Sequence, residues 1–331
     1  MKDARELRIA MLGMIPGNGH PYSWSAIING YDPIAMARCP YPVIPKYLGE
    51  RPFEQVRIDG ARVTHVWTDD PTEAAAVAEA ARIETIVARP EDVIGQVDAV
   101  IISTDDGNDH VRRARAFVEA GLPVFIDKPL AINLPDLIQF VDWHRAGRRI
   151  LSTSGMRYMP EMSLIREHPE RLGALRWITS FTCKSWERYG IHALESVYPV
   201  LGPGFVTVQT QHRTGEDIVH LRHRTGALLT VAAIEDAVGS FGSVHFHGTG
   251  GEAALKLGRT YDAFRAQLQA FIAFVKTGRH PFPFQQTVEL MLLLIAGIRS
   301  RNEGGRSICV DALWKEIGDD FPDTLGDAPN L

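Results

Sequence analysis

Lys128 stands at a point in the sequence from which its ammonium group could direct one positive charge at a substrate oxygen. Val124 to Ile126 form a short run of β-branched and aromatic side chains, as in a strand buried on both faces of a parallel sheet. Pro129 ends this pattern, because proline lacks a backbone N–H and disfavours helix at the preceding residue. Lys128 is therefore expected at the carboxyl end of a central strand, the edge where open parallel sheets bind ligands. The alternative is a solvated lysine in a loop, and the tripeptide Asp127-Lys128-Pro129 does not decide between the two.

A glycine-rich turn near the amino terminus has the composition of a dinucleotide site. The strand predicted at Leu7 to Leu12 runs into Gly13, Gly17 and Gly19, and a helix is predicted from about Ser23. A strand, a glycine turn and a helix together can hold a diphosphate at the helix amino terminus. The glycines do not follow the G-x-G-x-x-G spacing, so a plain loop is an equally good interpretation.

The second predicted strand, Val63 to Trp67, is followed by two aspartates, Asp69 and Asp70. A carboxylate at this point can bond the ribose hydroxyls of an adenosine and repel a 2′-phosphate, so it favours NAD over NADP. Either aspartate could instead cap the helix that begins near Pro71. One aspartate can serve each purpose.

The composition of the 331 residues fits a cytoplasmic enzyme of about two domains. A net charge of -5 gives no reason to expect nucleic acid or an anionic membrane as partner. The three cysteines are far apart and predict reduced thiols. The amino-terminal residues lack a signal-peptide layout, and the most apolar segment, 290–298, is too short to span a bilayer. His245 and His247 share a strand face, but no carboxylate or cysteine stands at a ligand spacing nearby, and we expect no metal.

Strands and helices alternate in the first half of the chain, whereas strands dominate most of the second half. Further strands of the first half are predicted at 99–103 and 149–153. Those of the second half are predicted at 174–182, 205–211, 218–222, 227–234 and 243–247. We therefore predict an α/β protein. Residues 1–155 should form a Rossmann-type, doubly wound parallel sheet, and residues 156–331 an α+β domain with a largely antiparallel, open sheet.

Residues 31–60 interrupt this alternation with five prolines and little periodicity. The segment leads from the first helix toward the second strand, so we expect it at the amino-terminal edge of the sheet, opposite the ligand edge. Packing or a subunit contact is the predicted role, and the alternative is that the segment reaches a neighbouring subunit's site.

Several motifs occur in the order seen in a known enzyme family. They are Asp98 to Thr104, His110, Glu119 to Gly121, Asp127 to Ala131, Arg157 to Pro160, Gly190 to Glu195, and Ser300 with Gly304 and Gly305. Over nearly its whole length the chain resembles the glucose–fructose oxidoreductase/inositol dehydrogenase (Gfo/Idh/MocA) family, whose signature has glutamate in place of Asp127. The resemblance implies a homodimer or homotetramer formed through the carboxy-terminal sheet. It also implies an NAD site at Gly13, Met14, Ile15, Asp69, Thr104, His110, Asp127 and Lys128.

Within this resemblance, His192 is the predicted proton acceptor. Oxidation of a secondary alcohol needs a base for the hydroxyl proton, and imidazole titrates near neutrality. Lys128 would bond the same oxygen and stabilise the developing alkoxide. If 191–197 is helical, Glu195 lies one turn further on and could fix the imidazole tautomer. The alternative is a histidine that caps this helix.

One position departs from the family pattern. The family has an aspartate four residues before the histidine, where this chain has Arg188, which is not a base at neutral pH. Only Lys128 and His192 therefore transfer as catalytic residues. An arginine could instead anchor a carboxylate or phosphate of the substrate. The other predicted substrate contacts are Trp186 and Tyr189, which could stack on a sugar ring, and Arg157, which could reach the site from the sixth strand.

The predicted activity is hydride transfer between NAD and a secondary hydroxyl of a sugar, cyclitol or sugar acid, with NADP the less favoured cofactor. One alternative is a lyase or glycosidase in which bound NAD is reduced and reoxidised within one cycle. The other is a non-catalytic NAD-binding or sugar-binding protein, which Arg188 and the irregular glycine turn would also suit.

Overall fold

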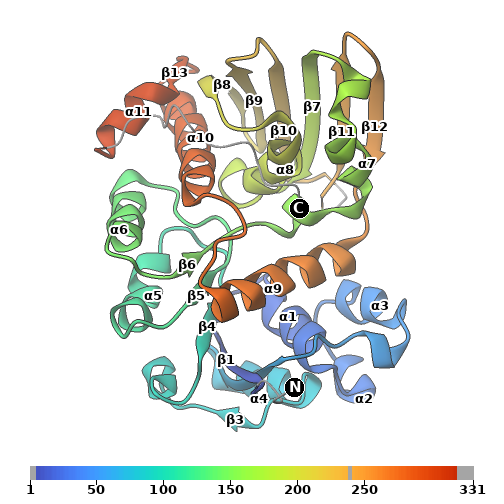
Figure 1. Ribbon diagram of the computed structural model, residues 1–331, viewed down its shortest axis with the longest axis vertical. Helices are drawn as coiled ribbons and strands as arrows, with labels where there is room; N and C mark the ends of the chain where they lie inside the picture. Colours follow the sequence, from blue (N-terminus) through green and yellow to red (C-terminus); the bar gives the residue numbers. More distant parts are fainter. Residues whose placement is uncertain (1–4, 238–240, 319–331) are drawn as a thin grey trace. The chain divides into compact units, whose positions relative to one another are not determined.

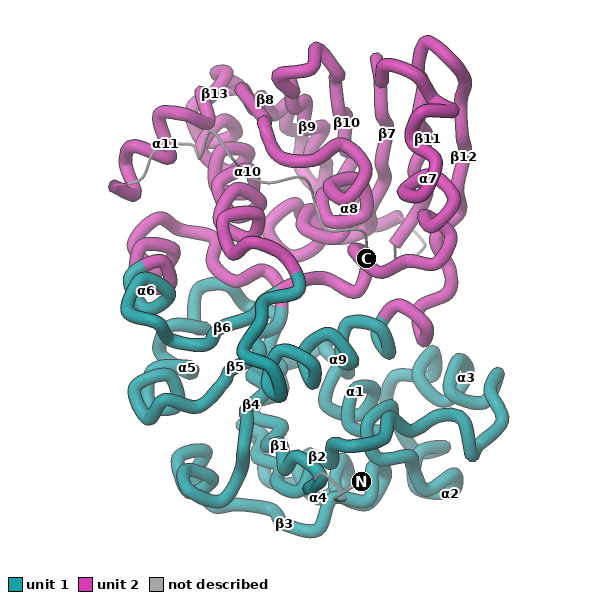
Figure 2. The backbone as a smooth tube through the Cα atoms, in the orientation of Figure 1, with its two compact units in different colours: residues 1–127, 142–152, 264–281 teal, residues 128–141, 153–263, 282–331 magenta. Residues whose placement is uncertain are grey.

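The structure is a computed structural model that describes residues 5–237 and 241–318, and it divides into two compact units (Figure 1, Figure 2). Unit 1 comprises residues 1–127, 142–152 and 264–281, and unit 2 comprises residues 128–141, 153–263 and 282–331. Each unit is formed by three separate ranges of the chain. The boundary between two domains at residue 155, which the sequence analysis proposed, stays a prediction. No helix of the described ranges is long and apolar enough to cross a bilayer.

Unit 1 is built on a six-stranded parallel sheet in the order β3-β2-β1-β4-β5-β6. The strands are β1 Leu7–Leu12, β2 Ala61–Trp67, β3 Thr85–Ile86, β4 Ala99–Ile102, β5 Val124–Ile126 and β6 Ile150–Leu151. The prediction of a doubly wound parallel sheet is confirmed, and only β3 was missed, because a strand of two exposed residues has no apolar pattern.

The helices of unit 1 lie on both faces of this sheet. Helices α1 (His20–Asn29) and α4 (Pro71–Ala80) contact each other and β2, whereas α5 (His110–Glu119) packs on β4 and β5. Right-handed crossovers that run outward from β1 and β4 in opposite directions place these helices on opposite faces. The carboxyl ends of β1 and β4 therefore flank the switch point of the sheet, where ligands bind in such folds.

The proline-rich segment 31–60 is ordered and lies against the glycine-rich turn. It forms α2 (Pro33–Met36), α3 (Val43–Gly49) and the short helix η1 (Phe53–Gln55). A side chain at Gly19 would come within 2.7 Å of both Tyr41 and Ile44. The hydroxyl of Tyr47 donates to Ser23 of α1. The predicted location at the amino-terminal edge of the sheet holds for the end of the segment, because the Leu7 N–H at the start of β1 donates to the Gly60 carbonyl. It is wrong for the middle of the segment, where Tyr41 and Ile44 pack on the turn at the ligand edge.

Unit 2 contains a seven-stranded sheet in the order β12-β11-β7-β10-β9-β8-β13. Its strands are β7 Leu175–Cys183, β8 Phe205–Arg213, β9 Glu216–His223, β10 Leu228–Ile234, β11 Ser243–Gly248, β12 Glu252–Lys256 and β13 Ile308–Cys309. The β7–β10 pair is parallel and the other pairs are antiparallel, as the largely antiparallel prediction requires. Strands β12 and β13 were not predicted.

Helices α8 (Trp186–Leu201) and α10 (Phe284–Asn302) pack on this sheet and on each other (Figure 1). Buried Glu289 of α10 accepts hydrogen bonds from the Tyr198 hydroxyl and from the backbone N–H groups of Gly204 and Phe205. Burial raises the pKa of Glu289 despite these donors. The carboxyl group thus links α8, α10 and the start of β8. The remaining helices are α6 (Leu134–Arg145), α7 (Ser163–Glu167), α9 (Thr260–Thr277) and α11 (Val310–Glu316).

The sheet of unit 2 has one fully buried face and one partly exposed face. Along β10, the side chains alternate between buried and half-buried positions. A hollow on the partly exposed face is lined by Thr179, Ser180, Phe181, Ile218, Thr230, Ala232, Ser243 and His245. Oligomerisation through this sheet remains a proposal.

Two partly buried histidines of unit 1 should make the stability of the protein fall in mild acid. Burial and then the nearby His144 lower the pKa of His280 from 6.5 to about 4, and burial also lowers the pKa of His144. Between pH 6.5 and about pH 4, His280 binds a proton in the unfolded chain but not in the folded chain. The free energy of unfolding therefore falls as the pH drops below about 6.5.

We therefore expect His280→Gln to flatten the decline of Tm between about pH 7 and about pH 5. After discounting for partial exposure of the imidazole, the effect should be roughly 1–2 kcal/mol at the acid end. His168→Gln serves as the control, because His168 is more exposed and no burial effect on stability is expected there. Identical Tm–pH curves for wild type and His280→Gln would contradict this assignment.

Candidate active site

The turn after β1 in unit 1 requires glycine at residue 13. Gly13 has φ of +92°, and a side chain there would lie 2.8 Å from the methyl group of Thr104. Its N–H donates to the Trp67 carbonyl at 2.8 Å, and its carbonyl accepts from the Ser103 hydroxyl at 2.7 Å. The ends of β1, β2 and β4 are thereby joined at Gly13.

Asp127 anchors the glycine-rich turn from the end of β5. Its fully buried carboxylate accepts from Asn18 Nδ2 at 3.0 Å and pairs with His20 Nδ1. Asn18 Nδ2 also lies 3.0 Å from the Ser103 carbonyl, and the His20 ring stacks on Trp24 with centroids 4.1 Å apart. Asp127, which the sequence predicted to bind cofactor, therefore stabilises the conformation of the turn. Asn18 and His20 also take part, and the sequence analysis did not predict them as site residues.

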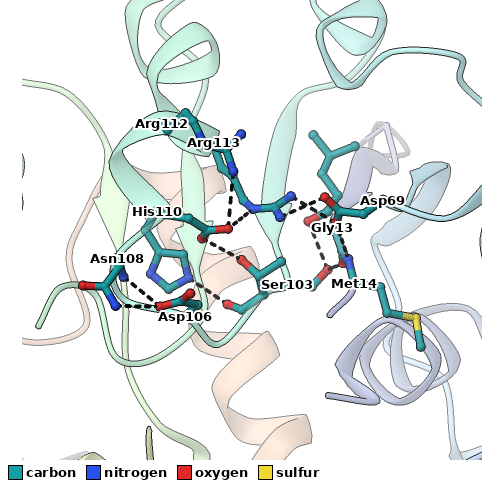
Figure 3. Close-up of polar contacts among 12 residues, drawn as sticks. Gly13, Met14, Asp69, Ser103, Asp106, Asn108, His110, Arg112 and Arg113 are labelled. Atoms are coloured by element: carbon teal, nitrogen blue, oxygen red, sulfur yellow. Dashed lines mark hydrogen bonds and ion pairs between the residues drawn. The ribbon is translucent and has the colours of Figure 1, made fainter. Parts of the chain in front are cut away.

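Asp69 lies beside the same turn and is paired with an arginine. Both of its carboxylate oxygens accept from Arg113 of α5, at 2.9 and 3.1 Å, and one also accepts from the Met14 N–H at 3.2 Å (Figure 3). Arg113 Nε donates to Asp109 at 2.5 Å. Partial burial lowers the pKa of Arg113, but the carboxylates of Asp69 and Asp109 raise it by more, so the pKa lies above its ordinary value.

The capping alternative for the two aspartates is also resolved by the structure. Asp70 caps α4, because its side chain accepts from the Thr72 N–H. Asp69 is left to face Met14 and Arg113. Arg113 and Asp109 were missed, because their roles depend on how α5 packs rather than on a local motif.

Thr104 and His110, the other predicted cofactor residues, are both fully buried, Thr104 in the turn after β4 and His110 as the first residue of α5. His110 Nε2 lies 2.8 Å from the Thr104 carbonyl, so the imidazole holds the backbone of this turn. The Asn108 side chain donates to Asp106 in the same turn (Figure 3). These contacts shape the edge at which Gly13, Met14 and the half-buried Ile15 lie.

In unit 2, Lys128 and His192 both lie close to the aromatic ring of Tyr189. Lys128 Nζ is 5.0 Å from the centroid of the Tyr189 ring, and the His192 ring is 4.7 Å from it in an edge-on arrangement. Both Lys128 and His192 are buried, and Tyr189 is half-buried. Phe241 lies edge-on to His192 at 4.9 Å. The ammonium and imidazole groups predicted from the sequence are thus brought together.

Ser154 is the hydrogen-bond partner of His192 Nδ1, at 2.7 Å. A hydrogen on Nδ1 that donates to Ser154 Oγ leaves the ring lone pair on Nε2, the atom that would take a proton. Both carboxylate oxygens of Glu195 accept from other groups, one from the Ser154 N–H at 3.0 Å and one from Arg157. The predicted tautomer role of Glu195 is therefore corrected, since it acts on His192 through Ser154.

Arg157 extends this chain of hydrogen bonds through its contact with Glu195. Its Nε pairs with Glu195, its Nη1 donates to Gln286 at 2.9 Å, and its guanidinium lies 4.0 Å from the Phe282 ring centroid. The arginine is buried with these partners. These contacts give Arg157 the role of positioning Glu195 and Ser154, in place of the direct contact with substrate that the sequence predicted.

Trp186 is a packing residue, which corrects its predicted stacking on a sugar. Its indole N–H donates to the Leu294 carbonyl of α10 at 3.0 Å, and side chains at Gly190 or Gly297 would come within 2.5 Å of its ring. The indole therefore fills the contact between α8 and α10. Arg188 and Tyr189, by contrast, are half-buried in the first turn of α8.

The described ranges contain no group of three or more histidine, cysteine or acidic side chains placed to hold a metal ion. His247 stacks on Trp177 at 5.6 Å and lies 3.5 Å from Glu252. His245 lines the hollow on the partly exposed face of the sheet.

Comparison with known proteins finds a family similarity over part of this chain. Residues 47–154 match the GFO_IDH_MocA model, described as an oxidoreductase family with an NAD-binding Rossmann fold. Residues 47–154 of this chain are thus similar to the Gfo/Idh/MocA oxidoreductase family. The matched range ends at Ser154 and leaves out the irregular glycine turn and the first part of segment 31–60.

Two curated relatives match part of this chain. The chain is 40% identical over 104 residues to inositol 2-dehydrogenase 1 of Saccharopolyspora erythraea, and 36% identical over 103 residues to inositol 2-dehydrogenase 3 of that organism. The first match covers 30% of this chain and 31% of the relative. The chain thus matches about a third of the length of these relatives.

Solved structures extend the fold likeness to nearly the whole chain. Scyllo-inositol dehydrogenase from Lactobacillus casei, solved with NAD(H) and scyllo-inositol, has a TM-score of 0.72 at 13% identity, with 92% of this chain and 99% of that chain covered. Myo-inositol 2-dehydrogenase from Lactobacillus plantarum has a TM-score of 0.70 at 14% identity, with the same shares covered. At these identities the likeness concerns the fold alone.

Proposed function

We propose that this protein oxidises a secondary hydroxyl of a sugar, cyclitol or sugar acid and passes the hydride to NAD. The observation that carries the proposal is the convergence of Lys128 and His192 on the Tyr189 ring. An ammonium group and an imidazole at one place can respectively stabilise an alkoxide and accept its proton. The inositol dehydrogenase names of the relatives support a polyol as substrate.

Each residue has a distinct part in this reaction. NAD, when bound, supplies the hydride acceptor, and the turn from Gly13 to Ile15 with Asp69 would hold it. Lys128 would donate to the substrate oxygen, and His192 Nε2 would accept the hydroxyl proton. Arg157 and Glu195 position Ser154, and a hydrogen bond from His192 Nδ1 to the Ser154 hydroxyl would keep Nε2 free for the proton. Formation of NADH in step with oxidation of members of a polyol panel tests the proposal.

Asp69→Ser should shift the cofactor preference toward NADP. The substitution removes a carboxylate that would repel a 2′-phosphate, and it releases Arg113 from its bidentate pair so that the guanidinium can bind that phosphate. We expect the ratio of kcat/KM for NADP to that for NAD to rise by about 10- to 100-fold, the worth of a charge-assisted hydrogen bond.

The double variant Asp69→Ser/Arg113→Ala is the matched control for this shift. It should lose most of the gain, because no guanidinium remains to bind the phosphate. Tighter binding of NADP than of NAD by the unmodified protein in calorimetry would rule out the role given to Asp69.

Arg188 should favour substrates that carry an anionic group. We propose that its guanidinium, one helical turn before His192 on α8, binds a carboxylate or phosphate of the substrate. Arg188→Ala should then raise KM chiefly for anionic substrates, by about 1.5–3 kcal/mol in binding free energy. Equal increases in KM for neutral and anionic substrates would count against this role.

A further inference from the structure

A second cation, Lys184, lies next to the Lys128–Tyr189–His192 cluster. Lys184 follows β7 directly and precedes α8, and its Nζ lies 2.9 Å from the Tyr189 hydroxyl and 4.3 Å from the Tyr189 ring centroid. Lys128 Nζ lies 5.0 Å from the same centroid. Two ammonium groups therefore approach one phenol ring, which itself contacts the His192 ring.

The backbone at Lys184 has a conformation that is unfavourable for a lysine. Its φ of +62° is in the left-handed region, and within the described ranges Arg82 is the other non-glycine residue with positive φ. Glycine or asparagine would adopt this conformation more easily, so a long side chain there has a local energetic cost. Strained residues of this kind gather at functional sites.

The charge of Lys184 is not neutralised by a carboxylate in the described part of the chain. Its contacts there are with the neutral Tyr189 hydroxyl and ring, and no acidic side chain forms an ion pair with it. One of the three ammonium donors is used by the hydroxyl, so two donors remain for a ligand. Lys184 is half-buried, so its charge is less screened than that of a fully exposed lysine.

We propose that Lys184 and the Tyr189 hydroxyl form an anion subsite that selects polyols carrying a carboxylate or phosphate group. The inference rests on the proposed function and deepens it by naming the substrate class. A carboxylate or phosphate ester accepts from an ammonium at short range, whereas a neutral hydroxyl gains much less from the same contact. Lys184 is a specificity residue in this account, separate from the proton transfer assigned to His192.

The test uses glucose, glucuronate and glucose 6-phosphate, which share a ring and differ at one carbon. Calorimetry on the protein saturated with NADH measures binding without turnover. Wild type should bind both anions about 10- to 150-fold more tightly than glucose, the range of a hydrogen bond between charged groups. Lys184→Asn should lower this preference by about 10-fold, and Lys184→Arg should restore part of it. The preference that remains in Lys184→Asn should be lost when Arg188→Ala is added.

The asparagine variant separates a binding role from a structural one. Asparagine is favoured at positive φ, so Tm should hold or rise while the preference for anions falls. Lys256→Asn is the matched control, because Lys256 is an exposed lysine at the end of β12, and it should keep the wild-type preference.

The outcomes distinguish this inference from the proposed function. If wild type binds the three sugars equally or not at all, or if Lys184→Asn keeps the wild-type preference for anions, the anion subsite is overturned. If the anions bind with the expected preference but no polyol yields NADH, the subsite stands and the proposed oxidation fails.

Discussion

Lys128→Met should lower kcat by about 100- to 1,000-fold, because one preorganised donor to the developing alkoxide is lost. Methionine keeps much of the bulk of the buried lysine side chain, so the fold around Tyr189 should survive the change. The affinity for NAD should change little, since Asp69, Met14 and the glycine turn are untouched. Steady-state kinetics and NAD titration measure the two effects separately.

The control for this variant is Lys315→Met, which removes an exposed lysine from α11 in the same unit. Its kcat should match that of wild type. A kcat for Lys128→Met within a few-fold of wild type would show that the alkoxide is stabilised elsewhere.

His192→Asn should lower kcat by about 100- to 10,000-fold through the loss of general base assistance. Asparagine can still bond Ser154, so the hydrogen-bonded chain from Arg157 should remain in place. The fall of kcat on the acid side of the pH–rate profile should also disappear, because it reports protonation of the base. A variant that keeps this acid limb would assign the base to another group.

Lys128 and His192 are proposed to act on one oxygen, so their losses should not multiply. The double variant Lys128→Met/His192→Asn should retain more activity than the product of the two single losses predicts. Fully multiplicative losses would mean that the two residues act independently.

The parts of the site that depend on local sequence were predictable. A buried apolar run followed by Asp127, Lys128 and Pro129 fixes the end of a parallel strand, and the structure has β5 at Val124–Ile126. His192 lies within a strongly apolar helical pattern, which the structure shows as α8. Hydrophobic period and proline chemistry act over a few residues, so they can be interpreted without tertiary contacts.

The parts that depend on packing between distant segments were not predictable. Arg113 reaches Asp69 across 44 residues of sequence, and Ser154 reaches His192 across 38. Trp186 has the residue type of a sugar-stacking side chain, and only the close approach of Gly297 shows that it is packed within unit 2. Segment 31–60 has no periodicity, so its contact with Gly19 became visible only in three dimensions.

The most direct test of the account follows a deuterium label from the carbinol carbon of an oxidised polyol. The protein is incubated with NAD and the labelled substrate, and mass spectrometry measures the label in the nicotinamide product and in the ketone. Hydride transfer predicts one labelled NADH released for each ketone formed. Turnover that releases no net NADH would indicate transient redox within a lyase or glycosidase cycle, and binding without turnover would indicate a sensor. Either result would contradict the proposed oxidation.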